Sequence, residues 1–215
     1  MHPYDFIIVS AYSLAPAALA GVVRFYRTDA VFNPFIYLLW LGIANEIYSS
    51  VVINRGDSNA FNNNIYVLGE ALLLLWQFYK WEVLKRHRWI YVLPGVAVLA
   101  GWGLDNVWPG DIHVPEKLSR MYICAMVLVL AIVKLVQLPK EVKGKHYRIA
   151  CTIACAGLVL YNAMNVYLEF LFHAFGTAPW RGHLFWWGGW ANIIANFLFF
   201  IAVLWIPRKV FRLPT

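Results

Sequence analysis

The sequence predicts an all-α membrane protein built as a bundle of seven transmembrane helices. Its 215 residues are 61% hydrophobic and 13% charged, whereas a soluble domain has about 25% charged residues. An apolar stretch of about 20 residues can cross the hydrocarbon core of a bilayer as a helix. Seven such stretches occur, at 4–25, 30–53, 63–83, 89–108, 118–138, 149–173 and 184–206. Because the connections are short, residues 1–215 are expected to form a single transmembrane domain.

Residues in and between these stretches refine the prediction. Pro16 is expected to kink the first helix, and residues 1–5 lack the basic region of a cleaved signal peptide, so this helix is expected to be retained. The Asn-rich segment 54–64 predicts a polar loop between the second and third helices. Trp81 is expected in the aromatic belt at the membrane surface. Lys134 is expected to extend its ammonium group to the nearby lipid–water boundary.

Four of the stretches carry polar residues at helical spacing, which places those residues on one face of each helix. In the second stretch they are Gly42, Glu46, Ser49 and Ser50, with Asn45 beside them; in the third, Asn63, Tyr66, Glu70 and Gln77; in the sixth, Asn162, Asn165, Glu169 and His173; in the seventh, His183, Trp187, Asn192 and Asn196, with Trp190 nearby. If these faces converge, they line a polar cavity inside the bundle.

Three glutamates lie well inside apolar stretches: Glu46, Glu70 and Glu169. A charged side chain at the bilayer centre costs roughly 2.5–3.5 kcal/mol on insertion scales. Each carboxyl group is therefore expected to be paired, protonated, hydrated or bound to a ligand. Arg120 is the strong base best placed to pair with one of them, and it cannot neutralise three. The asparagines are equally consistent with hydrogen bonds that join helices.

The basic residues predict the orientation. Fourteen of the 18 Lys and Arg residues fall on one side of the bundle, in or near the connections after the first, third and fifth stretches and in the tail. The positive-inside rule then places the N-terminus outside and the C-terminus in the cytoplasm, with all three glutamates in the outer half of the membrane. The charges favour anionic lipid headgroups at the cytoplasmic face. Their division among several loops disfavours nucleic-acid binding.

The sequence lacks the motifs that are typical of common metal-dependent and cofactor-dependent enzymes. Cys124, Cys151 and Cys155 lie within apolar stretches, and the last two are one helical turn apart, a spacing typical of small-residue packing. Without a CxxC motif or a nearby histidine, no metal site is expected. No Walker loop, HExxH, GxSxG or dinucleotide fingerprint occurs, so no cofactor is expected. The seventh stretch has no lysine for a retinal Schiff base.

Four motifs carry a resemblance to known proteins. They are Asn45-Glu46-Ile47-Tyr48, then Asn64-Ile65-Tyr66 with Glu70, then Tyr161 with Asn165, and finally Asn192 with Asn196-Phe197-Leu198-Phe199. With this layout the chain resembles, over nearly its whole length, small seven-helix membrane proteins of Bacteroidota-type bacteria, a group with no assigned activity. The resemblance implies a multi-pass protein of the bacterial inner (plasma) membrane. Similar seven-helix modules serve as sensory inputs to signalling proteins, so it also implies a sensing role.

Three functions remain open. The first is a receptor-like module that binds a small polar or cationic ligand from outside and signals to a cytoplasmic partner. Its candidate ligand-binding residues are Asn45, Glu46, Tyr66, Glu70, Arg120, Asn162, Asn165, Glu169, Trp190, Asn192 and Asn196. The second is a small-solute or proton-coupled transporter, which would need a polar path through the inner half as well. The third is an intramembrane lipid-modifying enzyme with paired carboxyl groups as acid and base, although no nucleophile accompanies them.

Overall fold

The computed structural model describes residues 3–84, 89–108, 110–114, 118–175 and 181–209, and their secondary structure is helical. The helices are α1 (Pro3–Tyr12), α2 (Ala15–Arg24), α3 (Asn33–Asn54), α4 (Ala60–Lys80), α5 (Val92–Asn106), α6 (Leu118–Gln137), α7 (Lys145–Phe175) and α8 (Arg181–Trp205). Short 3-10 turns occupy Phe25–Arg27, Ala30–Phe32 and Leu138–Lys140. Within the described ranges the backbone pairing typical of strands is limited to one isolated bridge, between Thr28 and Arg208.

The predicted all-α bundle is confirmed, since each predicted helix is present with ends within four residues of those expected. Among the described residues, five segments are long and apolar enough to cross a membrane: Asp5–Arg27, Ala30–Asn54, Ser119–Lys140, Lys145–Leu171 and Trp186–Trp205. Helix α4 is more polar than these. Helix α5 has 15 residues, about 22 Å of helix against a core about 30 Å thick.

The first predicted helix is divided into α1 and α2 by a break at Ser13–Leu14, two residues before Pro16. Proline fixes its own backbone angle and lacks an amide donor, so it is tolerated in the first turn of a helix and disrupts the preceding one. The break leaves polar groups of α1 available to other helices. The carbonyl oxygen of Ser10 accepts hydrogen bonds from the Ser13 hydroxyl and from the Asn192 side chain of α8.

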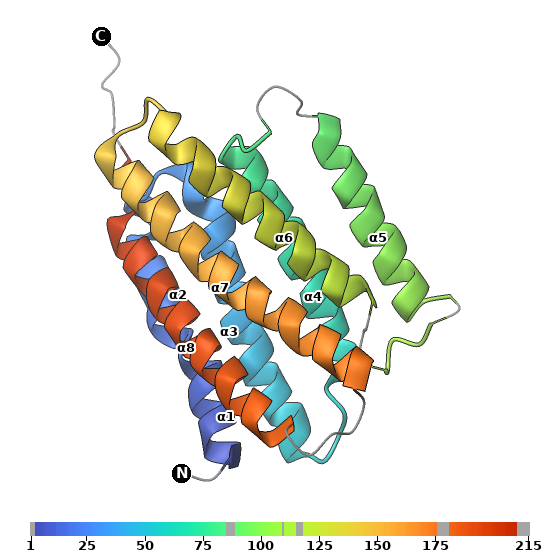
Figure 1. Ribbon diagram of the computed structural model, residues 1–215. Coiled ribbons are helices and arrows are strands. Elements are labelled where there is room, and N and C mark those ends of the chain that lie inside the picture. Colours follow the sequence, from blue (N-terminus) through green and yellow to red (C-terminus); the bar gives the residue numbers. More distant parts are fainter. Residues whose placement is uncertain (1–2, 85–88, 109, 115–117, 176–180, 210–215) are drawn as a thin grey trace.

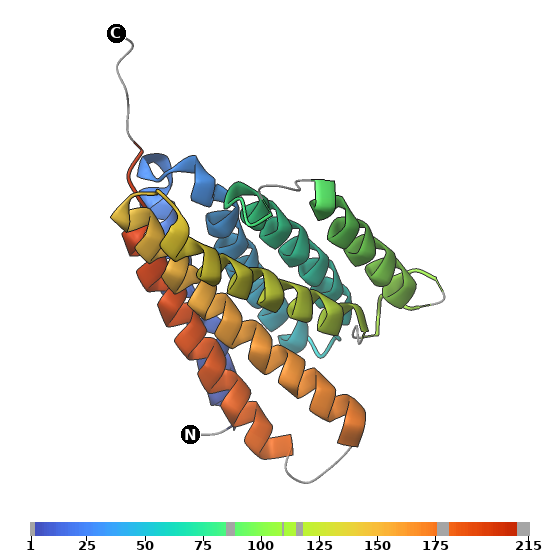
Figure 2. The same cartoon turned by 45° about the horizontal axis from the view of Figure 1, so that its top comes forward.

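The helices pack lengthwise, with α7 between α6 and α8, and with α3 against α4 (Figure 1). Cys151 and Cys155 are fully buried with Ala150 and Ala154 on α7, where small side chains allow neighbouring helices to approach. Helix α5 lies at the edge of the bundle, against α4 and α6, in both views (Figures 1 and 2). Helix α1 begins at one end of the bundle and α8 ends at the other, and these are here called the N-terminal end and the C-terminal end.

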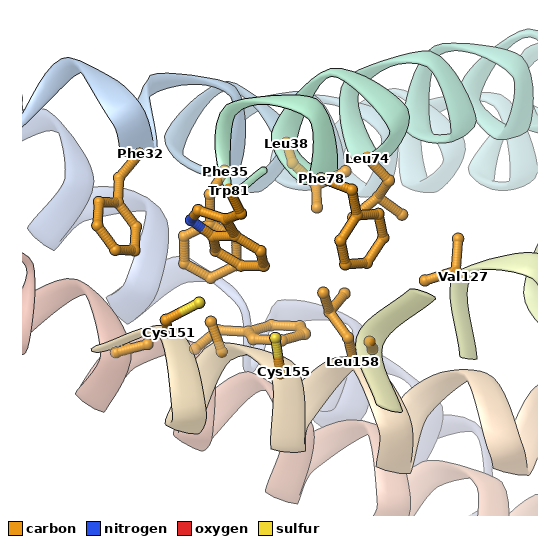
Figure 3. Packing of buried hydrophobic residues seen from close by; sticks show 14 of the residues in the cluster. Phe32, Phe35, Leu38, Leu74, Phe78, Trp81, Val127, Cys151, Cys155 and Leu158 are labelled. Atoms are coloured by element: carbon orange, nitrogen blue, oxygen red, sulfur yellow. The ribbon is translucent and has the colours of Figure 1, made fainter. Parts of the chain in front are cut away.

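The half of the bundle nearer the C-terminal end is filled by aromatic side chains. Phe32, Phe35, Phe78 and Trp81 are fully buried (Figure 3), and the Trp81 ring lies 5.8 Å from the rings of both Phe32 and Phe78. The expectation that Trp81 lies in a surface belt is therefore wrong. Helix α4 ends at Lys80, and the chain reverses direction at Glu82, which has a φ of 57°. Trp81 lies between these two residues, and its side chain therefore remains packed inside the bundle.

Gln77 is a polar side chain of this half that is buried and hydrogen-bonded within the protein. Gln77 is fully buried; its carbonyl oxygen accepts from the Phe35 amide at 2.7 Å and its amide donates to the Val31 carbonyl at 2.9 Å. These bonds join the start of α3 to the end of α4. Gln77 therefore has a structural role in the described chain, although it shares a helix face with Glu70.

Lys134 does not extend to the membrane boundary as expected. Its side chain is fully buried, and its ammonium group donates to the Trp81 carbonyl at 2.6 Å and to the Glu141 carboxylate. The connection between α6 and α7 folds back over the end of α6, which brings Glu141 to Lys134. The Glu141 carboxylate, seven residues along the chain, therefore neutralises the buried Lys134 ammonium group in place of solvent.

Replacement of Lys134 by methionine is expected to destabilise the protein by about 3 kcal/mol, because it leaves a partly buried carboxylate unpaired. Among the described residues, the second Glu141 oxygen already has no hydrogen-bond partner. Thermal unfolding in detergent would measure the loss, with Lys140→Met, at an exposed lysine, as the matched control. The double variant Lys134→Met/Glu141→Gln should recover part of it. Equal stability of Lys134→Met and Lys140→Met would contradict this role.

Candidate ligand-binding cavity

A cavity of about 390 Å³ lies in the half of the bundle nearer the N-terminal end. It is bounded by α1, the end of α3, the starts of α4 and α6, the end of α7 and the start of α8. Its polar lining consists of Ser10, Glu46, Tyr66, Glu70, Arg120, Tyr161, Asn165, Asn192 and Asn196. Small-molecule sites typically enclose about 300–1,000 Å³ and combine apolar walls with a few polar groups. The cavity has the size and mixed lining of such a site.

Seven of the eleven candidate residues line this cavity: Glu46, Tyr66, Glu70, Arg120, Asn165, Asn192 and Asn196. They come from five helices, and on each helix the cavity-lining residues follow the helical spacing of the sequence. The polar faces of α3, α4, α7 and α8 therefore meet in the bundle interior. Helix α6 contributes Arg120 near its start.

Three other candidates have different surroundings. The buried Asn45 accepts a hydrogen bond from the Asn62 side chain at 2.7 Å, which joins α3 to α4. The Asn162 amide donates to the carbonyl one turn back in its own helix at 2.8 Å. Trp190 is 54% exposed and packs against Phe6 at a ring distance of 5.4 Å. These residues do not line the cavity.

Glu169, the remaining candidate, is not a lining residue but pairs with Arg120, which is one. The Arg120 Nε atom is 3.7 Å from the Glu169 carboxylate, and the two side chains are 32% and 24% exposed. Arg120 also interacts electrostatically with Glu70, which lies one turn beyond Tyr66 on α4 and interacts with the Tyr66 side chain. The Arg120 guanidinium group is thus shared between the carboxyl groups of Glu169 and Glu70.

Glu46 is the third carboxyl group of this region and lines the cavity from α3. Among the described residues, no hydrogen bond or salt bridge to the Glu46 side chain is recorded. Arg120 is the one cationic residue in the described lining, and it is shared with Glu169 and Glu70. With its carboxyl groups ionised, the cavity therefore carries a net negative charge.

The contribution of α1 to the cavity was not predicted from the sequence. Ser10 lines the cavity, and Asn192 donates to both its carbonyl and its hydroxyl oxygen, at 3.0 and 3.1 Å. Asn196 donates to the Ser13 hydroxyl at 2.8 Å. The two asparagines therefore hold α8 against the break in the first helix while they face the cavity. The serines at positions 10 and 13, three residues apart, were a signal for this contact.

A glycine pair on α8 allows α1 to approach closely. A Cβ atom on Gly189 would collide with the Phe6 ring, and the Ser10 hydroxyl donates to the Gly189 carbonyl at 3.2 Å. Phe6 also stacks on Trp186 at a ring distance of 4.4 Å. Phe6 and Gly188–Gly189 line the cavity. Paired glycines in a membrane helix are a sequence signal for such a close approach.

Tyr161 was also missed as a site residue, although its spacing from Asn165 was part of the resemblance. It lines the cavity from α7, and its side chain interacts with that of Asn165 one turn along the helix. It also interacts electrostatically with Arg120 and Glu70. Tyr161 therefore belongs to the polar group around Arg120.

The deep side of the cavity is apolar. Leu38, Leu39, Leu158 and Phe199 line it where it meets the aromatic half of the bundle. The Phe199 ring lies 5.6 Å from the Phe35 ring, and Leu38 and Leu158 lie beside the aromatic cluster (Figure 3). These residues belong to the same buried cluster as Phe35, Phe78 and Trp81. Packed apolar side chains therefore border the cavity on the side of the C-terminal end.

No protein-family model matches the chain, and comparison with curated proteins and with solved structures also yields no match. Within the described part of the chain, no group of three or more His, Cys, Asp and Glu side chains could hold a metal ion. The side chains of His173 and His183, which belong to two of the polar stripes, lie outside the described residues. The chemistry of the cavity thus depends on carboxyl, amide, hydroxyl and guanidinium groups.

Cysteine labelling can test the cavity and its position. Met164→Cys places a thiol in the lining at a residue with no recorded hydrogen bond, whereas Leu74→Cys places one in the packed core. A small charged methanethiosulfonate reagent is expected to modify the first variant in the folded protein and the second only after denaturation. The three native cysteines are buried and should remain unmodified. A Met164→Cys thiol as protected as the Leu74→Cys thiol would contradict a water-filled cavity.

Proposed function

We propose that the chain is a multi-pass, receptor-like protein of a bacterial inner membrane that binds a small organic cation in this cavity. The observation that carries the proposal is the charge of the lining, in which Glu46 and Glu70 face a space whose one described cation, Arg120, is shared between Glu70 and Glu169. An ionised carboxylate shielded from bulk water needs a cation or several donors. A bound organic cation supplies the positive charge that such a carboxylate needs.

The remaining lining suits an organic cation better than a bare metal ion. Phe6, Tyr66 and Tyr161 provide aromatic faces, which attract ammonium groups. Asn165 adds an amide that can accept a hydrogen bond from an ammonium N–H. Leucine and methionine side chains cover much of the remaining wall. A primary or secondary ammonium ion with a small apolar body matches this combination, and a quaternary ammonium ion matches it without the hydrogen bond to Asn165.

A ligand in this position would contact elements that are far apart in the sequence. Ser10 on α1, Glu46 on α3, Glu70 on α4 and Asn192 on α8 all line the same space. A ligand that binds one arrangement of these helices more tightly shifts the population towards it. With the orientation predicted by the basic residues, the cavity would lie in the outer half of the membrane, and the C-terminal end would face a cytoplasmic signalling partner.

The closed side of the cavity favours a receptor over a transporter. A carrier needs a second arrangement that opens a path past Leu158 and Phe199, where side chains now pack against the aromatic cluster. The described lining also contains no histidine or cysteine to act with Ser10 as a nucleophilic pair. The lipid-modifying enzyme is therefore the least supported of the three functions.

Isothermal titration of the purified protein with a panel from tetramethylammonium to phenethylamine tests the proposal. At least one cation is expected to bind, and Glu70→Gln should weaken its binding about ten- to hundredfold, as expected for the loss of a charged partner. The matched control is Glu82→Gln, whose carboxylate pairs with Lys143 at the other end of the bundle. It should leave the affinity unchanged.

A carboxylate with the same apolar body as the bound amine should not bind. The proposal fails if no cation in the panel binds, or if Glu46→Gln and Glu70→Gln both retain the affinity of the unmodified protein. Uptake of the bound cation into proteoliposomes, abolished by Glu70→Gln, would instead assign the cavity to a transporter.

A further inference from the structure

Several basic residues near the C-terminal end have partners within the protein. Arg24 donates from its two terminal nitrogens to the last carbonyls of α8. Lys134 is paired with Glu141, and Lys143 lies 3.6 Å from the Glu82 carboxylate. These charges stabilise helix ends and connections, so they are not free for an external anion.

Lys145 and Arg148 differ from these residues. Both are exposed on the first turns of α7, and neither forms a salt bridge with a carboxylate of the described residues. They are three residues apart, so they lie on the same helix face. Two positive charges therefore lie side by side without a counterion among the described residues.

These two residues border a groove of about 460 Å³ between the end of α6 and the start of α7. Its walls include Leu135 from α6 and Ile149 and Ile153 from α7. No acidic residue lines it among the residues described. The groove thus combines an apolar wall with two cations at one end.

The cations and the apolar residues of the groove are separated along α7. Lys145 and Arg148 come first, and the lining residues after them, Ile149, Thr152 and Ile153, are uncharged, with Ile153 about 12 Å beyond Lys145 at 1.5 Å per residue. The groove also lies where two candidate membrane spans end and begin, Ser119–Lys140 and Lys145–Leu171. The cations therefore lie at the end of the span, and the apolar wall extends from them into it, as the headgroup and acyl chain of a phospholipid do.

We propose that this groove binds an anionic phospholipid, with the phosphate between Lys145 and Arg148 and an acyl chain along Leu135, Ile149 and Ile153. Basic pockets between transmembrane helices are suited to acidic headgroups. A free phosphate would use the two cations and leave the apolar wall uncovered, whereas a lipid uses both. This site is separate from the cavity and does not depend on the function proposed for it.

Native mass spectrometry of protein released from nanodiscs of phosphatidylcholine and phosphatidylglycerol tests the site. The unmodified protein is expected to retain phosphatidylglycerol, and Lys145→Gln/Arg148→Gln should reduce the retained amount about ten- to thirtyfold. The matched control is Lys80→Gln/Arg27→Gln, which removes the same charge from exposed positions near the same end of the bundle. It should retain phosphatidylglycerol as the unmodified protein does.

A second variant, Ile153→Trp, fills the groove while it keeps both cations, and it should also lose the lipid. Equal losses in the control and in Lys145→Gln/Arg148→Gln would show that surface charge in general holds the lipid, and would overturn the site. If phosphatidylcholine were retained as well as phosphatidylglycerol, the two cations would have no role in selecting the lipid. Displacement of the lipid by inorganic phosphate alone, with Ile153→Trp unaffected, would remove the role of the apolar groove.

Discussion

The shortage of positive charge around Arg120 is the constraint on which the rest of the site depends. In an apolar bundle, a carboxylate cannot be left to bulk water, and Arg120 on α6 is shared between Glu169 on α7 and Glu70 on α4. This sharing draws three helices together around one polar centre. Glu46 on α3 is left facing the same space. The surrounding helices therefore enclose a cavity, which water or a ligand can occupy, instead of a packed core.

Polar side chains have different surroundings in the two halves of the bundle. Near the C-terminal end, Gln77 and Lys134 are fully buried, and each is bonded to groups of the protein. Nearer the N-terminal end, Asn192 and Asn196 use their amide N–H groups to hold α1 and still line an open space. Buried polar residues that are hydrogen-bonded within the protein contribute to stability. Those that retain unused charge or bonding capacity are the ones that can recognise a ligand.

The helices and the meeting of four polar faces could be predicted from sequence, because apolar length and helical spacing are local properties. The neighbours of each side chain could not. Asn45 and Glu46 are adjacent in one stripe, yet Asn45 bonds to Asn62 while Glu46 lines the cavity. The role of Ser10 depends on contact with α8, about 180 residues away. Lys134 was misplaced because its counterion approaches only when the connection after α6 folds back.

A density map of the protein in lipid nanodiscs, recorded with and without the tightest-binding amine, would show whether the cavity exists and what occupies it. The map is expected to show an open space bordered by Glu46 and Glu70, closed at Leu158 and Phe199, with added density beside Glu70 when the amine is present. A map in which these two carboxyl groups faced lipid on different sides of the bundle would rule out a shared binding site. A polar channel that continued past Phe199 to the C-terminal end would rule out a closed receptor cavity.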